Sequence, residues 1–413
     1  MAENEKIVPD ERLYDYLRTY AKSIQLRSPK FRITEGSSKG DNYVSVVYRV
    51  TIEGIEEWNE AKKLELVLKT TRNYASDDIL TSSRVTELFE REAFFYQEIL
   101  PIFKETMKNH GGMHDRFPIL YDVNDESGKE ILLLENLTPQ GFVMSKSKIM
   151  DYPHLKLVMR CLGEFHAYSF ITQAANPTGF EKMRQMKEHV FREVENSSEQ
   201  LEAKERMENM SKTLFDVVLK ALANEDKHYS ERYQRFMENM SQNMFDATNG
   251  KEIEPYAVVN HGDCWTNNML FKYDQEKNPC DLRFVDLQIC RYASPVLDLV
   301  YILFCCCTQE TRSKCFNQLI KDVYYKTLSD TIKKAGYDPN VLFPYEILLQ
   351  HFTKFGKYAA GMATFTVHIF TTNDVDLKIA FDTNSLLERI ETDSVYRNML
   401  IETFKDIIDR NYI

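Results

Sequence analysis

Apolar residues recur at helical spacing near the start of the chain. The segment "DERLYDYLRTYAKSIQLR" at 10–27 carries Leu13, Tyr16, Leu17 and Tyr20 at the intervals of one helix face. The pattern predicts an amphipathic helix over these residues.

Period-two alternation then replaces the helical spacing and indicates strands. A run of small residues, "TEGSSKGDN" at 34–42, is typical of a turn, and alternating segments follow it at 43–53 and 64–70. Two further strand-like runs are "FPILYDVND" at 117–125 and "EILLLENL" at 130–137. Neighbouring strands joined by short turns predict an antiparallel sheet.

One long amphipathic helix interrupts this sheet pattern at 81–104, "TSSRVTELFEREAFFYQEILPIFK". Its apolar stripe consists of Val85, Leu88, Phe89, Phe95, Tyr96 and Ile99. Glu92 falls in the middle of the stripe, where a carboxylate needs a partner because unpaired buried charge is costly.

Helical periodicity dominates the second part of the chain. It covers 154–170, "HLKLVMRCLGEFHAYSF", and then a long charged region from about 180 to 248. Short strands are predicted at 256–259, 268–273 and 282–286, and the remainder of the chain to its end has helical spacing.

These elements predict an α+β fold with two lobes. Residues 1–140 form a small N-terminal lobe with an antiparallel sheet and one inserted helix, and residues 141–413 form a larger, mainly helical lobe. A chain of 413 residues is long enough for two lobes that share an ample core.

Composition and charge narrow the function classes. Hydrophobic residues make up 43% of the chain and charged residues 28%, which is typical of a globular protein. The net charge of −11 argues against a nucleic-acid partner, which requires a basic surface. The longest apolar run, at 299–307, has about half of the roughly 20 residues that a membrane span needs.

The cysteines and the first residues indicate a cytoplasmic protein. The segment at 1–17 is acidic and lacks the apolar core of a secretory signal. Of the eight cysteines, Cys305, Cys306 and Cys307 are consecutive in an apolar run, and no C-x-x-C pair exists. We therefore expect reduced, mostly buried thiols.

A polar turn between two apolar runs, "VVNHGDCWTNNMLF" at 258–271, is the strongest chemical signal. It places Asp263 and Asn268 close together, and the apolar strand that follows ends in Asp286. Carboxylate and amide oxygens are hard ligands that suit magnesium, and this set leaves one acid for proton transfer. A capped surface hairpin is the alternative interpretation of the turn.

A lysine on the predicted sheet supplies the opposite charge. In "LELVLKT" the alternation places Leu64, Leu66 and Leu68 on one face of the strand and Lys69 on the other. Lys69 is the natural partner for Glu92 of the inserted helix. A solvated lysine at a strand end is the alternative for Lys69 alone.

Taken together, these motifs resemble the insect ecdysteroid kinase-like family, which is related to aminoglycoside phosphotransferases and choline kinases. The resemblance rests first on "HGDCWTNN" at 261–268 and "DLQ" at 286–288. Other matching segments are "GDNYVS" (40–45), "REAFFY" (91–96), "LLLENLTPQGF" (132–142), "LGEFHAYS" (162–169) and "SPVLDLVYIL" (294–303). The chain does not resemble a protein kinase, because "HGD" and "DLQ" replace H-R-D and D-F-G.

The resemblance implies a protein-kinase-like fold, ATP as phosphate donor and Mg²⁺ as cofactor. Asp263 would accept the proton of the acceptor hydroxyl, and Asn268 and Asp286 would hold magnesium against the β- and γ-phosphates. The Lys69–Glu92 pair would aim the lysine at the α- and β-phosphates.

Other segments contribute weaker nucleotide contacts. Gly40, Asp41 and Asn42 would cover the phosphates with backbone N–H groups, although the G-x-G-x-x-G spacing is missing. The resemblance places the adenine against the backbone at Glu135 to Leu137.

Three further polar residues are expected to have structural rather than catalytic roles. The resemblance implies that Asp298 hydrogen-bonds the catalytic loop, and His261 is expected to brace that loop rather than transfer protons. His166 is interpreted as a core histidine with satisfied hydrogen bonds.

The acceptor is expected to be a hydroxyl of a small molecule, and the resemblance favours an ecdysteroid or a similar lipophilic alcohol. Methionines recur in the helical region from 180 to 250 and suit an adaptable apolar pocket, although plain helix packing is the better explanation for any one of them. A choline, ethanolamine or aminoglycoside kinase and a non-catalytic carrier with the same fold are the alternatives.

Overall fold

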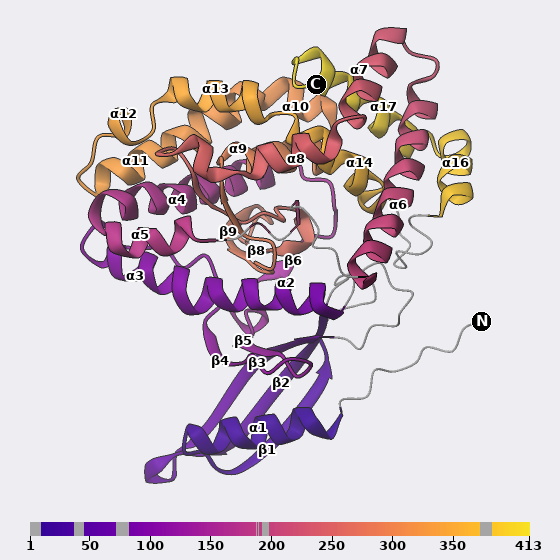
Figure 1. Ribbon diagram of the computed structural model, residues 1–413. Coiled ribbons are helices and arrows are strands. Elements are labelled where there is room, and N and C mark those ends of the chain that lie inside the picture. Colours follow the sequence, from indigo (N-terminus) through magenta and orange to yellow (C-terminus); the bar gives the residue numbers. More distant parts are fainter. Residues whose placement is uncertain are drawn as a thin grey trace.

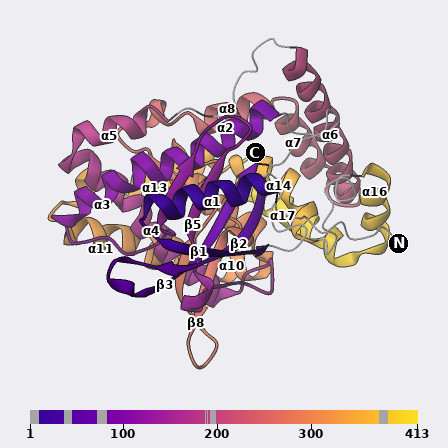
Figure 2. The ribbon, with the colours of Figure 1, turned by 90° about the horizontal axis from the view of Figure 1, so that it is seen from below.

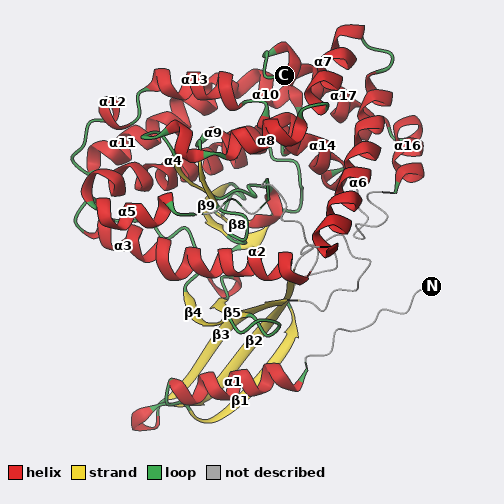
Figure 3. Ribbon diagram, viewed as in Figure 1, coloured by secondary structure: helices red, strands yellow, loops and turns green. Residues whose placement is uncertain are grey.

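The protein is described from a computed structural model that covers residues 10–36, 45–71, 82–186, 188, 190–191, 198–371 and 382–413. Figures 1 and 3 show its two lobes: an antiparallel sheet lies at one end, and helices make up most of the other.

The small lobe is built on a five-stranded antiparallel sheet in the order β1-β2-β3-β5-β4. Its strands are β1 (Arg27–Glu35), β2 (Ser45–Ile55), β3 (Ala61–Thr71), β4 (Leu120–Asn124) and β5 (Ile131–Glu135). Between β3 and β4 the chain forms α2 (Ser82–Phe94), a π-helical segment (Phe95–Ile99) and α3 (Leu100–Lys108) without a break. The α+β fold with a small sheet lobe and one inserted helix is confirmed.

The two faces of this sheet pack differently. Helix α1 (Glu11–Ser23) crosses the outer face in Figure 2 and buries Leu13 and Leu17 against Leu66 and Leu68 of β3. The predicted alternation of β3 is therefore present, and its leucine face packs beneath α1. The opposite face carries Lys69 toward α2, because successive side chains of a strand point to opposite sides.

The large lobe is mainly helical. Its helices are α4 (Tyr152–Ala175), α5 (Pro177–Arg184), α6 (Ser198–Leu222), α7 (Lys227–Met237), α8 (Met240–Thr248), α9 (Val296–Cys305), α10 (Gln309–Asn317), α11 (Lys326–Lys334), α12 (Pro339–Leu342), α13 (Tyr345–Phe355), α14 (Tyr358–Phe370), α16 (Thr383–Thr392) and α17 (Ser394–Asp409), with a π-helical segment (Gln318–Tyr325) between α10 and α11.

Helix α4 is the centre of the large lobe. Its residues from 157 to 172 are all buried except Arg160, so neighbouring elements surround the helix along that length. At Gly163 an added Cβ would lie 2.6 Å from the Tyr324 carbonyl oxygen, which shows how closely the π-helical segment Gln318–Tyr325 approaches α4. This close packing makes α4 a rigid support for the elements around it.

The large lobe also contains two small sheets. One has the order β6-β8-β9, with β6 (Val143–Met144), β8 (Met269–Tyr273) and β9 (Pro279–Phe284). The other pairs β7 (Val258–Asn260) with β10 (Arg291–Ala293). All their pairings are antiparallel, and their connecting turns carry the polar residues singled out in the sequence.

The boundary of one predicted helix is wrong, and some strands were missed. The N-terminal helix ends at Ser23, and the edge strand β1, which was not predicted, begins at Arg27. Strand β10 was also missed. The helical character predicted from about 180 to 248 is confirmed, because most of the described residues there belong to four helices, α5 to α8, and Met183 and Met244 are fully buried in the core.

The cysteines lie as expected, because six of the eight are buried and none is in a disulfide. Among the described residues, no helix combines the length and the apolar character that crossing a bilayer requires. The division of the chain at residues 140 and 141 stays a prediction.

Candidate active site

The loop after β7 carries Asp263 and depends on Gly262 for its shape. Gly262 has φ +87°, a left-handed conformation that side chains disfavour, and an added Cβ would lie 2.1 Å from the Ile289 carbonyl oxygen. The loop therefore lies directly against the chain that leads into β10. Trp265, two residues beyond Asp263, stacks on Phe370 of α14 with ring centroids 4.8 Å apart.

Asp298 of α9 holds this loop through hydrogen bonds to its backbone. Its two carboxylate oxygens accept hydrogen bonds from the backbone N–H groups of His261, at 2.8 Å, and Gly262, at 2.9 Å. Burial favours the neutral acid, but the contact with His166, at 3.2 Å, helps to lower the pKa of Asp298. The expected role of Asp298 as loop support matches this geometry.

The two histidines are structural in this arrangement. His261 is fully buried and contacts the Val285 carbonyl oxygen at 3.1 Å, which ties the loop to the end of β9. Burial lowers the pKa of His261, so the ring is neutral near pH 7. His166 is also fully buried, with Tyr324 on one ring nitrogen and Asp298 on the other.

Asp263 sits in a polar pocket with two side-chain donors. The Tyr301 hydroxyl donates to one carboxylate oxygen at 2.9 Å, and the Asn268 amide donates to the other at 2.8 Å. Burial and the nearby charge of Asp286 raise the pKa of Asp263 to about 6, against the effect of these two hydrogen bonds and of Arg291. A carboxylate with this pKa is a competent proton acceptor near neutral pH.

Strand pairing brings Asn268 and Asp286 to the same end of a hairpin. Met269 of β8 pairs with Phe284 of β9, and the Val285 N–H donates to the Asn268 carbonyl oxygen at 3.0 Å. Asp286 then has φ +65°, an uncommon left-handed conformation for a residue other than glycine. This turn ends the strand and directs the chain, with the Asp286 side chain, toward the small lobe.

Lys69 joins the two lobes at this point. Its ammonium lies 2.5 Å from the Glu92 carboxylate and 2.6 Å from that of Asp286, and both Lys69 and Glu92 are almost fully buried. Burial opposes the charged form, but Asp286 and Glu92 raise the pKa of Lys69 above its ordinary value. The other oxygen of Glu92 accepts the Leu287 N–H at 3.3 Å, so this carboxylate also binds the backbone next to Asp286.

The charges at this junction do not balance. One ammonium faces Glu92 and Asp286, and Asp263 adds a third acid whose pKa Asp286 raises. The Asn268 Nδ2 donates to Asp263, while its Oδ1 accepts no hydrogen bond from any residue that the structure describes. Excess negative charge with a free amide oxygen fits a divalent cation of the magnesium type.

Within the described ranges, no group of three or more His, Cys, Asp or Glu side chains is placed to hold a metal ion. Magnesium commonly takes most of its oxygens from phosphates and water, so the Asp286 carboxylate and the Asn268 amide oxygen would form part of such a ligand set.

The predicted adenine segment joins the two lobes after β5. The Glu135 N–H donates to the Ile119 carbonyl at 2.9 Å, and the Leu137 carbonyl accepts from the Gln140 N–H at 3.1 Å. The Leu137 N–H donates no backbone hydrogen bond within the described part of the chain. Gly40, Asp41 and Asn42 lie outside the described residues.

Two contributors to the site escaped the sequence reasoning. Tyr301 follows Asp298 by three residues in "LDLVYIL", so both polar groups share one side of an otherwise apolar helix. That spacing was an available signal. The Leu287 N–H carries no signal in the sequence, because any residue type offers a backbone donor.

Comparison with known proteins identifies one family and a set of similar solved structures. A family model described as the ecdysteroid kinase-like family matches residues 39–337. None of the curated proteins compared matches significantly. Among 46 matching solved chains, a candidate fructosamine-3-kinase from Haemophilus somnus 129PT is 12% identical, with a TM-score of 0.37 over 95% of this chain and 96% of that one. A likeness at that score supports no argument about function.

Proposed function

The chain belongs to the ecdysteroid kinase-like family, and from this membership and the site geometry we propose that it is a phosphotransferase that moves the γ-phosphoryl group of ATP to a hydroxyl of a small molecule. The observation that carries the proposal is the contact of Lys69, from the small lobe, with both Glu92 and Asp286. We infer that this contact brings a cation-binding acid, Asp286, and a phosphate-binding ammonium, Lys69, close to Asp263, the proposed acceptor of the hydroxyl proton.

The residues divide the work of transfer among them. The acceptor oxygen forms a bond to the γ-phosphorus, the bond from that phosphorus to the bridging oxygen of ADP breaks, and the hydroxyl proton passes to Asp263. Tyr301 and Asn268 fix the direction of that carboxylate through their hydrogen bonds at 2.9 and 2.8 Å. Position and charge supply most of the rate in such transfers.

The phosphates are proposed to lie against Lys69, which Glu92 aims from the inserted helix. Asn268 and Asp286 would hold Mg²⁺, which when bound neutralises the charge that develops on the phosphate oxygens. The backbone from Glu135 to Leu137 would take the adenine, and Gly40, Asp41 and Asn42 are proposed to cover the phosphates.

The acceptor is proposed to be an ecdysteroid or another lipophilic alcohol, as the family description suggests. Arg291 of β10 lies beside the Asp263 loop, and its guanidinium lies over the rings of Phe191, at 5.4 Å, and Tyr358, at 5.9 Å. Tyr358 and Arg291 are buried, whereas Phe191 is only partly buried, and an aromatic ring at this place is proposed to favour an acceptor with a flat apolar body.

The proposal is tested with purified protein, γ-labelled ATP and magnesium. The acceptor panel contains ecdysteroids, other sterols, choline, ethanolamine and aminoglycosides, followed by an extract of small metabolites. We expect label on a lipophilic alcohol, and no label when the magnesium is chelated. The matched variant Asp286→Asn keeps the side-chain shape and should give no label.

Other outcomes point to the alternatives. Transfer to choline or an aminoglycoside would replace the lipophilic acceptor with a polar one. ATP binding without transfer to any compound, from panel or extract, would contradict the enzyme and favour a carrier.

A further inference from the structure

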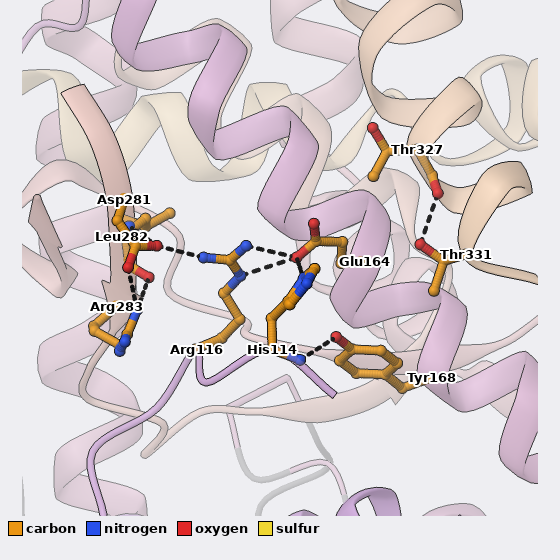
Figure 4. Close-up of polar contacts among 9 residues, drawn as sticks. All are labelled: His114, Arg116, Glu164, Tyr168, Asp281, Leu282, Arg283, Thr327 and Thr331. Carbon is orange, nitrogen blue, oxygen red and sulfur yellow. Dashed lines mark hydrogen bonds and ion pairs between the residues drawn. The ribbon is translucent and has the colours of Figure 1, made fainter. Parts of the chain in front are cut away.

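A buried arginine network lies outside the proposed catalytic groups, between α4 and β9 (Figure 4). Arg116, in the loop from α3 to β4, donates two hydrogen bonds to Glu164 of α4, at 2.9 and 2.7 Å, and one to Asp281 of β9, at 2.6 Å. The Arg116 side chain is 7% exposed and that of Glu164 is 10% exposed. We call Arg116, Glu164 and Asp281 the Arg116 clamp.

Further contacts fix the same loop. The Arg116 carbonyl oxygen accepts the Phe284 N–H at 2.7 Å, so the loop bonds to β9 through its backbone as well. The Tyr168 hydroxyl of α4 accepts the His114 N–H at 3.2 Å. The loop that follows the inserted helix is therefore attached to the large lobe on two sides.

The next residue extends the clamp into an aromatic cluster. Phe117 has ring centroids 4.9 Å from Phe95, 5.2 Å from Phe165 and 6.0 Å from Phe284. All four rings are buried. Close-packed rings leave little space for one element to move without its neighbours.

This cluster lies next to the residues that carry the charges of the site. Phe95 follows Glu92 by three residues on the inserted helix, and Phe284 precedes Asp286 by two residues. The Phe284 ring is also 5.5 Å from that of His261, in the loop of the proposed proton acceptor. The aromatic cluster is therefore close to Glu92, to Asp286 and to the loop that carries Asp263.

We propose that the Arg116 clamp sets the position of the inserted helix on the large lobe and so fixes where Glu92 holds Lys69. Arg116 is a positioning residue in this scheme, since it acts through Phe117, Phe95 and Glu92 without touching a substrate. Without the clamp, the carboxylates of Glu164 and Asp281 lose their shared cation and the loop loses its side-chain attachment to both elements. The proposal rests on the proposed function for its nucleotide readout only.

The first test compares two ligands of the full-length protein, MgATP and adenosine. In Arg116→Met the dissociation constant of MgATP should rise about 10-fold, because Lys69 no longer meets the phosphates correctly. Adenosine, which has no phosphate, should bind as in the wild type. In Arg116→Lys the dissociation constant of MgATP should lie between those of the wild type and Arg116→Met, because one ammonium cannot hold both carboxylates as the planar guanidinium does.

A matched control separates position from general stability. Arg312 is another buried arginine, which pairs with Asp406 and joins α10 to α17. Arg312→Met should lower the Tm and leave the ratio of MgATP to adenosine affinity unchanged. If Arg116→Met does not fold, Asp281→Asn removes one contact at a side chain that is 34% exposed and serves in its place.

A second test needs no nucleotide and so stands apart from the proposed function. The Tm is measured for Arg116→Met, Glu92→Gln and the double variant. The proposal predicts that the fall in Tm of the double variant differs from the sum of the falls in the two single variants. Additive losses, or an equal weakening of MgATP and adenosine in Arg116→Met, would overturn the clamp.

Discussion

Asp263→Asn should lower the turnover number about 10²–10⁴-fold, the range that a positioned general base contributes. The variant keeps the shape of the side chain and the oxygen that accepts from Tyr301. It loses the ability to take the proton of the attacking hydroxyl. The affinity for MgATP should change little, because Lys69, Asn268 and Asp286 remain.

The fold should tolerate this change. The folded pKa of Asp263, about 6, lies above its ordinary 3.8, so above pH 6 the ionised carboxylate opposes folding. A neutral amide removes that cost at neutral pH, although one of the two side-chain hydrogen bonds is lost. Thermal unfolding should therefore show a Tm close to that of the wild type.

Tyr301→Phe is the matched control. It removes the hydroxyl that donates to Asp263 at 2.9 Å and leaves the carboxylate in place. Turnover should fall far less than in Asp263→Asn. Near wild-type turnover in Asp263→Asn would remove the proton-acceptor role from this residue.

Lys69→Met should remove both activity and much of the stability. It leaves Glu92, at 1% exposure, without its cation, and an uncompensated buried charge costs about 3–5 kcal/mol of unfolding free energy. Denaturant unfolding measures this loss directly, and turnover should be undetectable.

The double variant Lys69→Met/Glu92→Met separates the two effects. Replacing a buried ion pair by apolar side chains of similar volume restores packing, so part of the lost unfolding free energy should return. Turnover should not return, because no ammonium then meets the phosphates. A double variant that regains both stability and turnover would show that Lys69 serves the fold alone.

The ion pair of Lys69 and Glu92 could be predicted from the sequence because each residue has a distinct position in a local pattern. Glu92 interrupts an apolar stripe, and Lys69 ends an alternating strand on the face opposite the leucines. The convergence of Asp263, Asn268 and Asp286 was also accessible, since a strand hairpin brings the ends of its strands together.

The Arg116 clamp was not accessible in this way. Arg116 and Asp281 are 165 residues apart, and "HDRFP" has no period that would separate a buried arginine from a solvated one. Strand β1 escaped because its side chains are exposed or only partly buried at an edge of the sheet, where the alternation is weak. Local pattern predicts which elements form, whereas these pairings depend on how distant elements pack.

The central claim is that Asp263, Asn268, Asp286 and Lys69 form one site for a divalent cation and the phosphates of a nucleotide. Titration of Mn²⁺ with ATP, followed by the electron paramagnetic resonance signal of free Mn²⁺, tests it most directly. The account predicts that wild-type protein removes more free Mn²⁺ than ATP does alone, and that Asp286→Asn removes no more than ATP. Equal titration curves for the wild type and Asp286→Asn would contradict it.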